Sequence, residues 1–214
     1  MALRSTSSPR TPQPEAGTGK GSLLGCLALV IAYVVTGKLA LLLALPPGYA
    51  SAIFPPAGIA VAAAFIGGRR TLPWILLGSL LLNLWVGYTP SHPITLTGAF
   101  AAGLIALASM LQAAGGGWRL RRAIGYPSPF DKASDVLKFL LLAPAICLVS
   151  ASLSVSALTL LGILDPAQIT TNWAAWWIGD TLGVIVMLPL VFVVAGEPRG
   201  LWRSREFSVA VPML

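Results

Sequence analysis

The sequence predicts an all-α protein: a polytopic bundle of transmembrane helices with six full spans, the start of a seventh and a cytoplasmic N-terminus. Hydrophobic residues make up 56% of the 214 residues and charged residues only 10%, whereas globular chains average about 45–50% apolar and about 25% charged. The mean hydropathy is +0.82. These values exclude an ordinary soluble domain. They also exclude a disordered chain, which would combine low hydrophobicity with high charge.

Six apolar runs reach the length of about 17–25 residues that a helix needs to cross the hydrocarbon core. The first run contains Thr36 and Lys38, and the second is interrupted by Pro55 and Pro56. The predicted spans are Leu23–Leu45, Tyr49–Ile66, Leu72–Tyr88, Ile94–Ala114, Val136–Leu164 and Trp173–Ala195.

The two ends of the chain differ from the rest. Residues 1–21 are rich in Ser, Thr, Pro and Gly, so we expect a disordered cytoplasmic tail. Residues 22–214 are expected to form one integral membrane domain. Its last apolar run, Phe207–Leu214, makes about two helical turns and is too short to span, so we expect this domain to be incomplete at its C-terminus.

The distribution of positive charge predicts the orientation. Of the 14 lysines and arginines, all but Lys38 fall in the N-terminal tail or in loops on the same predicted side of the membrane. Because cytoplasmic loops carry an excess of Lys and Arg, that side is expected to be cytoplasmic. Topology therefore accounts for the net charge of +7, and no nucleic-acid partner is predicted.

Several classes of active site are excluded by the residues present. The chain has one histidine and two cysteines, both cysteines lying inside apolar runs, so neither a metal site nor a disulfide framework is predicted. It contains no phosphate-binding glycine loop and no nucleophile motif. We therefore expect no catalytic residues, no metal, no cofactor and no enzymatic activity.

Two ionisable residues lie inside the predicted spans, where charge is costly and often functional. Lys38 lies seven residues before the outer end of the first span and Asp180 seven residues after the outer start of the sixth, which places both about 10 Å deep. Asn83 in the third span lies at a similar depth. One interpretation is a polar pocket open to the periplasm. The alternatives are a Lys38–Asp180 pair that couples the two helices and a Lys38 side chain that extends outward to the surface.

The segment from residue 46 to 58 carries four prolines and two glycines between apolar runs. Pro55 and Pro56 would break or kink a helix, and irregular backbone at membrane depth is tolerated only inside protein or beside a wet cavity. If a helix restarts at Pro56, its free N–H groups near Gly58 could hold an anionic group. A tight turn with a proline-led helix start explains the same residues.

Trp176 and Trp177 lie with Trp173 near the outer end of the sixth span. An aromatic belt at the membrane interface explains them well, and a stacking platform for a ligand is the alternative. Gly179 and Gly183 have the small-xxx-small spacing that lets helices approach closely.

Two stretches together resemble a known family. One runs from Thr36-Gly37-Lys38 through Leu45-Pro46-Pro47-Gly48 and Ile53-Phe54-Pro55-Pro56-Ala57-Gly58-Ile59-Ala60 to Gly68-Arg69-Arg70, and the other is Trp176-Trp177-Ile178-Gly179-Asp180-Thr181-Leu182-Gly183 with Leu188-Pro189-Leu190. They resemble the bacterial membrane-associated sensor domain of the first type, in the MASE family, over roughly residues 23–214. The resemblance implies an inner-membrane input domain that precedes cytoplasmic outputs such as histidine kinases, diguanylate cyclases or phosphodiesterases.

We therefore expect an integral membrane sensory domain of a bacterial signal-transduction protein, of the two-component or cyclic-di-GMP kind. It would detect an unidentified small ligand in the membrane or periplasm. Its expected partners are the lipid bilayer and a cytoplasmic histidine kinase or diguanylate cyclase output domain, and a homodimer stays open. The alternative is the substrate-binding module of a small-molecule transporter, because broken helices with buried charge are typical of transporters. The candidate residues for ligand binding or helix coupling are Lys38, Asp180, Asn83, Pro55, Pro56, Gly58, Trp176 and Trp177.

Overall fold

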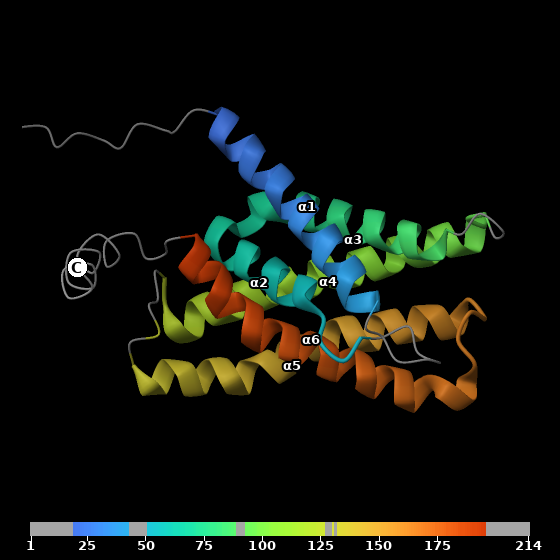
Figure 1. Cartoon of the computed structure of the whole chain (residues 1–214). Helices are drawn as coiled ribbons and strands as arrows, with labels where there is room; N and C mark the ends of the chain where they lie inside the picture. Colours follow the sequence, from blue (N-terminus) through green and yellow to red (C-terminus); the bar gives the residue numbers. More distant parts are fainter. Residues whose placement is uncertain (1–18, 43–50, 89–92, 127–129, 131, 196–214) are drawn as a thin grey trace, which may run out of the picture.

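The computed structural model describes residues 19–42, 51–88, 93–126, 130 and 132–195. Within this part of the chain every regular element is a helix, which confirms the predicted all-α class. Figure 1 shows α3, α4, α5 and α6 lying roughly along one direction, with α1 and α2 running obliquely among them. The elements are α1 (Gly19–Leu42), α2 (Pro55–Gly67), η1 (Gly68–Thr71), α3 (Leu72–Gly87), α4 (Leu96–Ile124), α5 (Ala133–Leu160), η2 (Pro166–Gln168) and α6 (Ile169–Val194).

Five helical stretches of the described residues are long and apolar enough to cross a membrane, so the chain is a multi-pass membrane protein. The second stretch, Pro55–Gly87, combines α2, η1 and α3. The predicted count of six full spans is therefore not confirmed. Residues 1–18 of the predicted tail and the expected seventh run Phe207–Leu214 lie outside the described residues, whereas Gly19–Gly21 already belong to α1.

The predicted second span, Tyr49–Ile66, is replaced by a short helix, α2 (Pro55–Gly67). α2 has 13 residues and is about 20 Å long, whereas the hydrocarbon core is about 30 Å thick. It begins at Pro55, where proline fits the first helical turn because that turn needs no N–H donor. Its first turn lies against the middle of α6, since Gly58 contacts Gly183. α2 therefore starts halfway along the bundle.

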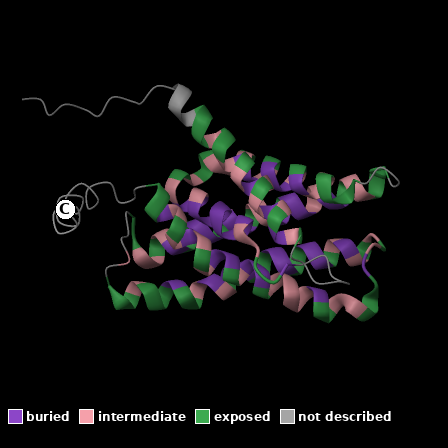
Figure 2. Ribbon diagram, in the orientation of Figure 1, coloured by how far each residue is buried: buried purple, intermediate pink, exposed green. Residues whose placement is uncertain are grey.

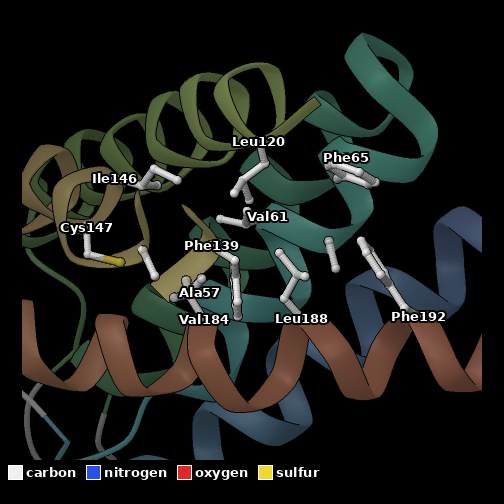
Figure 3. Packing of buried hydrophobic residues seen from close by; sticks show 12 residues of the cluster. Ala57, Val61, Phe65, Leu120, Phe139, Ile146, Cys147, Val184, Leu188 and Phe192 are labelled. Carbon is white, nitrogen blue, oxygen red and sulfur yellow. The ribbon is translucent and has the colours of Figure 1, made fainter. Parts of the chain in front are cut away.

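α2 is also the central helix of the bundle. Nine of its 13 residues are buried, and Figure 2 shows buried residues gathered in α2 and on the faces that surround it. Its sequence is rich in alanine. Small side chains let neighbouring helices approach closely in a membrane, where association depends on packing because lipid is as apolar as the side chains. The cluster around α2 includes Ala57, Val61, Phe65, Leu120, Phe139, Ile146, Cys147, Val184, Leu188 and Phe192 (Figure 3).

α4 continues past the predicted end at Ala114 as far as Ile124, through three consecutive glycines. A Cβ atom on Gly117 would lie 2.8 Å from the backbone of Ala64, and one on Gly116 would lie 2.7 Å from the side chain of Ile146. Gly116 and Gly117 are therefore contact surfaces for α5 and α2, whereas nothing lies within 4 Å of the position that a Cβ atom on Gly115 would take. Their close packing offsets the weak helix propensity of glycine.

Large apolar side chains cover the outward faces of the helices, as expected for a surface in contact with lipid acyl chains. This surface is made by every long helix. Examples are Leu24, Ile31, Leu39, Leu81, Phe100, Leu141, Leu153, Val186 and Val193.

The described basic residues gather at one end of the bundle, apart from Lys38. Arg69 and Arg70 lie in η1, which joins α2 to α3, and Arg121 and Arg122 lie in the last turn of α4. Figure 1 places these two helix ends and the start of α5 at the same end. The predicted grouping of positive charge is thus reproduced. That this end faces the cytoplasm stays a prediction.

Candidate functional site

A cavity of about 220 Å³ lies among α1, α3, α4 and α6. Three of the predicted site residues line it: Asn83, Trp176 and Asp180. It extends toward Gly87 and Gly98, where α3 ends and α4 begins. The cavity therefore reaches the end of the bundle opposite the basic residues.

Asp180 forms the polar centre of the site. It is only 2% exposed, and its Oδ2 atom accepts a hydrogen bond from Nε2 of Gln112 at 3.0 Å. Oε1 of Gln112 in turn accepts the backbone N–H of Ser150 at 3.2 Å. Among the described residues, Oδ1 of Asp180 has no hydrogen-bond partner. The amide of Gln112 therefore joins α4, α5 and α6 at one buried point.

A second group of polar side chains lines the cavity from α1, α3 and α4. The fully buried Tyr33 lines the cavity together with Ser79 and Ser109. Ser79 donates to Ser109 at 3.2 Å. Asn83 donates from Nδ2 to the carbonyl of Ser79, one turn earlier in α3, at 2.8 Å. Because this bond uses only the Asn83 amide N–H, the amide oxygen is an acceptor available to a ligand.

Lys38 does not pair with Asp180. Its ammonium group lies over the ring of Trp85, 4.9 Å from the ring centroid, an arrangement typical of a cation–π interaction. In the part of the chain that the structure describes, an ion pair joins Lys138 to Asp135.

α6 begins at Ile169, four residues before the predicted Trp173, so Asp180 lies 11 residues, or about 16 Å, from the start of its helix. The sixth helix therefore begins about one turn earlier than predicted. The equal depth of Lys38 and Asp180 stays a prediction, because residues 43–50, which follow α1, lie outside the described residues.

The proline-rich segment packs against α6. Ser51–Phe54 is not helical, and the N–H of Phe54 donates to the carbonyl of Gly179 at 2.9 Å. A Cβ atom on Gly179 would overlap the carbonyl oxygen of Ser51, and one on Gly183 would overlap that of Phe54, both at well under 3.0 Å. The Gly179–Gly183 pair thus forms a groove that holds the non-helical backbone, and Gly183 also makes the expected close helix–helix contact, with Gly58 of α2.

Pro55, Pro56 and Gly58 are structural within this arrangement. Pro56 and Gly58 are buried, and a Cβ atom on Gly58 would overlap the carbonyl oxygen of Gly183. None of the three lines the cavity. The predicted irregular backbone is present in Ser51–Phe54: Ser51 and Phe54 line the cavity, whereas Ala52 and Ile53 are exposed. The anion-binding alternative for the start of this helix stays a prediction.

The neighbouring tryptophans have different positions. Trp176 lines the cavity. Trp177 donates from its indole N–H to the carbonyl of Pro144 in α5 at 2.8 Å and stacks on Trp173, with ring centroids 5.8 Å apart. Trp177 therefore ties α6 to α5 at the proline inside α5, and Trp176 is the one that can contact a ligand.

The structure adds four residues that the sequence analysis did not single out: Gln112, Tyr33, Ser79 and Ser109. All are uncharged polar residues inside predicted spans. A search that weighed every polar side chain within an apolar run, and not only the ionisable ones, would have found them. Within the described residues, no group of three or more His, Cys, Asp or Glu side chains is placed to hold a metal.

A family model described as MASE1 matches residues 23–213, a stretch that contains every residue lining the cavity. No curated protein and no solved structure matches the chain.

Proposed function

The chain belongs to the MASE1 family of membrane-associated sensor domains, as its sequence motifs suggested, and we propose that it detects a small molecule and relays the event to a cytoplasmic output domain. A sensory membrane domain of this type is not a catalytic one. The output would be a histidine kinase or a diguanylate cyclase, and the membrane would be the bacterial inner membrane. The cavity would then face the periplasm.

The observation that carries this proposal is the position of the cavity on α6. Asp180 and Trp176 of α6 line the cavity. The neighbouring Gly179 and Gly183 of the same helix hold the backbone of Ser51–Phe54. A ligand that contacts these side chains contacts the helix against which α2 starts. Because α2 is short and packed on all sides, a shift of α6 would be transmitted to it.

The far end of α2 supports the same relay. Arg121 of α4 donates from Nε to the carbonyl of Phe65 and from Nη2 to that of Ile66 at 2.8 Å. The guanidinium group thereby satisfies carbonyls that the end of a helix leaves without partners. α2 is thus held by α6 at its start and by α4 at its end, and it leads directly into the Arg69–Arg70 turn at the predicted cytoplasmic end.

The relay requires two arrangements of α6 and α2 in equilibrium. A ligand shifts this equilibrium only if it binds one arrangement more tightly than the other. Spin labels at Leu137→Cys and Val194→Cys would report the distance between the first turns of α5 and the end of α6, where both side chains are exposed. The background would lack Cys26 and Cys147. We expect at least one class of solute, from a panel of small amines, alcohols, carboxylates and sugars added to proteoliposomes, to change this distance. An unchanged distance for every class would contradict the proposal.

The short helix α2 also favours a second candidate function, that of a transport module, because transporters place discontinuous helices beside their substrate sites. The same proteoliposomes separate the two functions. A sensor changes the label distance without uptake, whereas a transporter accumulates the radiolabelled solute inside the vesicle.

A further inference from the structure

We propose that the ligand of this cavity is a small organic amine whose ammonium group is held by Asp180 and whose apolar part packs against Trp176. This inference rests on the proposed sensory function and names the chemical class of the signal. It follows from the charge, the unpartnered atoms and the aromatic side chains of the cavity.

The unfilled acceptor on Asp180 is the first observation. The side chain is 2% exposed and lines the cavity. Gln112 occupies Oδ2, and Oδ1 has no hydrogen-bond partner among the described residues. Leaving an acceptor of this kind buried without a donor destabilises a protein, and an ionised group inside a membrane domain normally has a partner of opposite charge. A ligand with N–H donors would supply what the site lacks.

The second observation is the absence of a competing cation in the lining. The cavity is lined by one carboxyl group and by no Lys, Arg or His among the described residues. Lys38, in α1, is engaged with Trp85, and Arg121 is bound to the end of α2. The cavity therefore carries a net negative charge whenever Asp180 is ionised, which disfavours anions and favours cations.

The third observation is the rest of the lining. Tyr33, Phe54 and Trp176 contribute aromatic rings, which bind ammonium groups through their negative faces. The amide oxygen of Asn83 and the hydroxyl of Ser109 add hydrogen-bond acceptors. The volume of about 220 Å³ is below the range of about 300–1,000 Å³ that holds drug-sized ligands. It suits a short alkylamine or an amine with a single ring.

The test compares matched probes on the full chain in lipid nanodiscs. Phenethylamine and n-butylamine carry the cation, 2-phenylethanol and n-butanol are their neutral counterparts, and 3-phenylpropanoate is the anionic one. Binding is measured by calorimetry and by the shift in thermal unfolding temperature. We expect at least one amine to bind roughly tenfold or more tightly than its alcohol, since a charge-assisted hydrogen bond exceeds a neutral one by about this factor.

The variant Asp180→Asn keeps the shape of the side chain and removes its charge, and it should lower amine affinity roughly 10- to 100-fold. Asp135→Asn makes the same exchange at the far end of α5, where the carboxylate pairs with Lys138, and should leave binding unchanged. Trp176→Leu should also weaken amine binding. The Trp176→Leu variant still tests amine binding in the cavity if Asp180→Asn does not fold.

Four outcomes would overturn the inference: amines and alcohols that bind equally well, amine affinity that survives Asp180→Asn, the absence of amine binding, or an equal response to sodium ions alone. In each case the spin-label distance tests the proposed sensory function independently of amine binding. If an alcohol, a carboxylate or a sugar changes that distance, the domain is a sensor of another ligand class. If no solute does, the sensory function itself fails.

Discussion

Nε2 of Gln112 lies 3.0 Å from Oδ2 of Asp180, and this hydrogen bond joins α4 to α6 in the middle of the bundle. The same amide accepts the backbone N–H of Ser150 in α5. Three successive long helices, α4, α5 and α6, therefore meet through one uncharged side chain. In a membrane interior such polar contacts specify which helix faces pair, since apolar packing alone discriminates poorly between them.

The Gln112–Asp180 contact predicts a non-additive double-mutant cycle. Gln112→Leu and Asp180→Asn should each lower the free energy of unfolding in detergent, and the pair should show a coupling energy of about 0.5–3 kcal/mol, as contacting residues do. The matched cycle of Lys38→Met with Asp180→Asn should be additive within about 0.5 kcal/mol, because Lys38 lies over Trp85. A large coupling in the second cycle would restore the Lys38–Asp180 pair that the sequence suggested.

The glycine groove of α6 predicts that one added methyl group is damaging there. Gly183→Ala would drive a Cβ atom into the carbonyl oxygen of Phe54, and should lower the free energy of unfolding by at least the roughly 1–3 kcal/mol that is typical of overpacked cores. Gly103→Ala in α4 is the matched control, since nothing lies within 4 Å of the position that its Cβ atom would take. It should be neutral or stabilising by about 0.5–1 kcal/mol, because alanine favours helix over glycine. Equal effects at both positions would contradict the groove.

Arg121 and the adjacent Arg122 should differ in how much each contributes to the free energy of unfolding. Arg121→Lys replaces a planar group that binds two carbonyls, those of Phe65 and Ile66, by a single ammonium group. It should lower the free energy of unfolding by about 1–3 kcal/mol, the range for hydrogen bonds to charged groups. Arg122→Lys should change it by about 0.5 kcal/mol or less, since Arg122 is exposed and lies over Trp118. The measurement is the thermal or denaturant midpoint of both variants in the same detergent. Equal losses would show that Arg121 does not hold the end of α2.

The cavity predicts which positions react with thiol reagents from outside. In a chain without Cys26 and Cys147, Asn83→Cys should be labelled by a membrane-impermeant maleimide, because Asn83 lines a cavity that reaches the end of α3. Val61→Cys, in the fully buried centre of α2, is the control and should stay protected. Labelling of intact cells should come from the periplasmic side if the basic end of the bundle is cytoplasmic. Protection of Asn83→Cys in intact cells, together with its labelling in inverted vesicles, would reverse the orientation.

The position of the break in the second apolar run could be predicted from the sequence, but the length of the helix that follows it could not. Its apolar length predicted a full span over Tyr49–Ile66, whereas the structure has a non-helical stretch up to Phe54 and a helix from Pro55. Pro55 and Pro56 were correctly identified as a break. The length of helix on either side of a break depends on what satisfies the freed backbone groups. Here the carbonyl of Gly179 accepts the N–H of Phe54, and that carbonyl belongs to a helix more than 100 residues later in the chain.

The candidate site was predictable to a similar extent. Asn83 and Asp180 were selected as polar side chains inside apolar spans, and Trp176 as part of an aromatic cluster near the outer end of the sixth span; the structure brings all three to one cavity. Lys38 was selected on the same ground and is engaged elsewhere. The number of residues between two positions of one helix can be counted from sequence. The face on which a side chain lies, relative to another helix, cannot be counted when the helix is apolar on every side.

The sequence by itself determined the all-α class, the membrane location and the grouping of basic residues. These properties depend on composition, run length and charge, which are local and additive along the chain. Only the tertiary structure decided that α2 is a short helix at the centre, that Gln112 is the partner of Asp180 and that Arg121 binds the end of α2. Those outcomes depend on which buried donor meets which acceptor. In a bundle whose helices are apolar on all faces, that choice is made by three-dimensional packing.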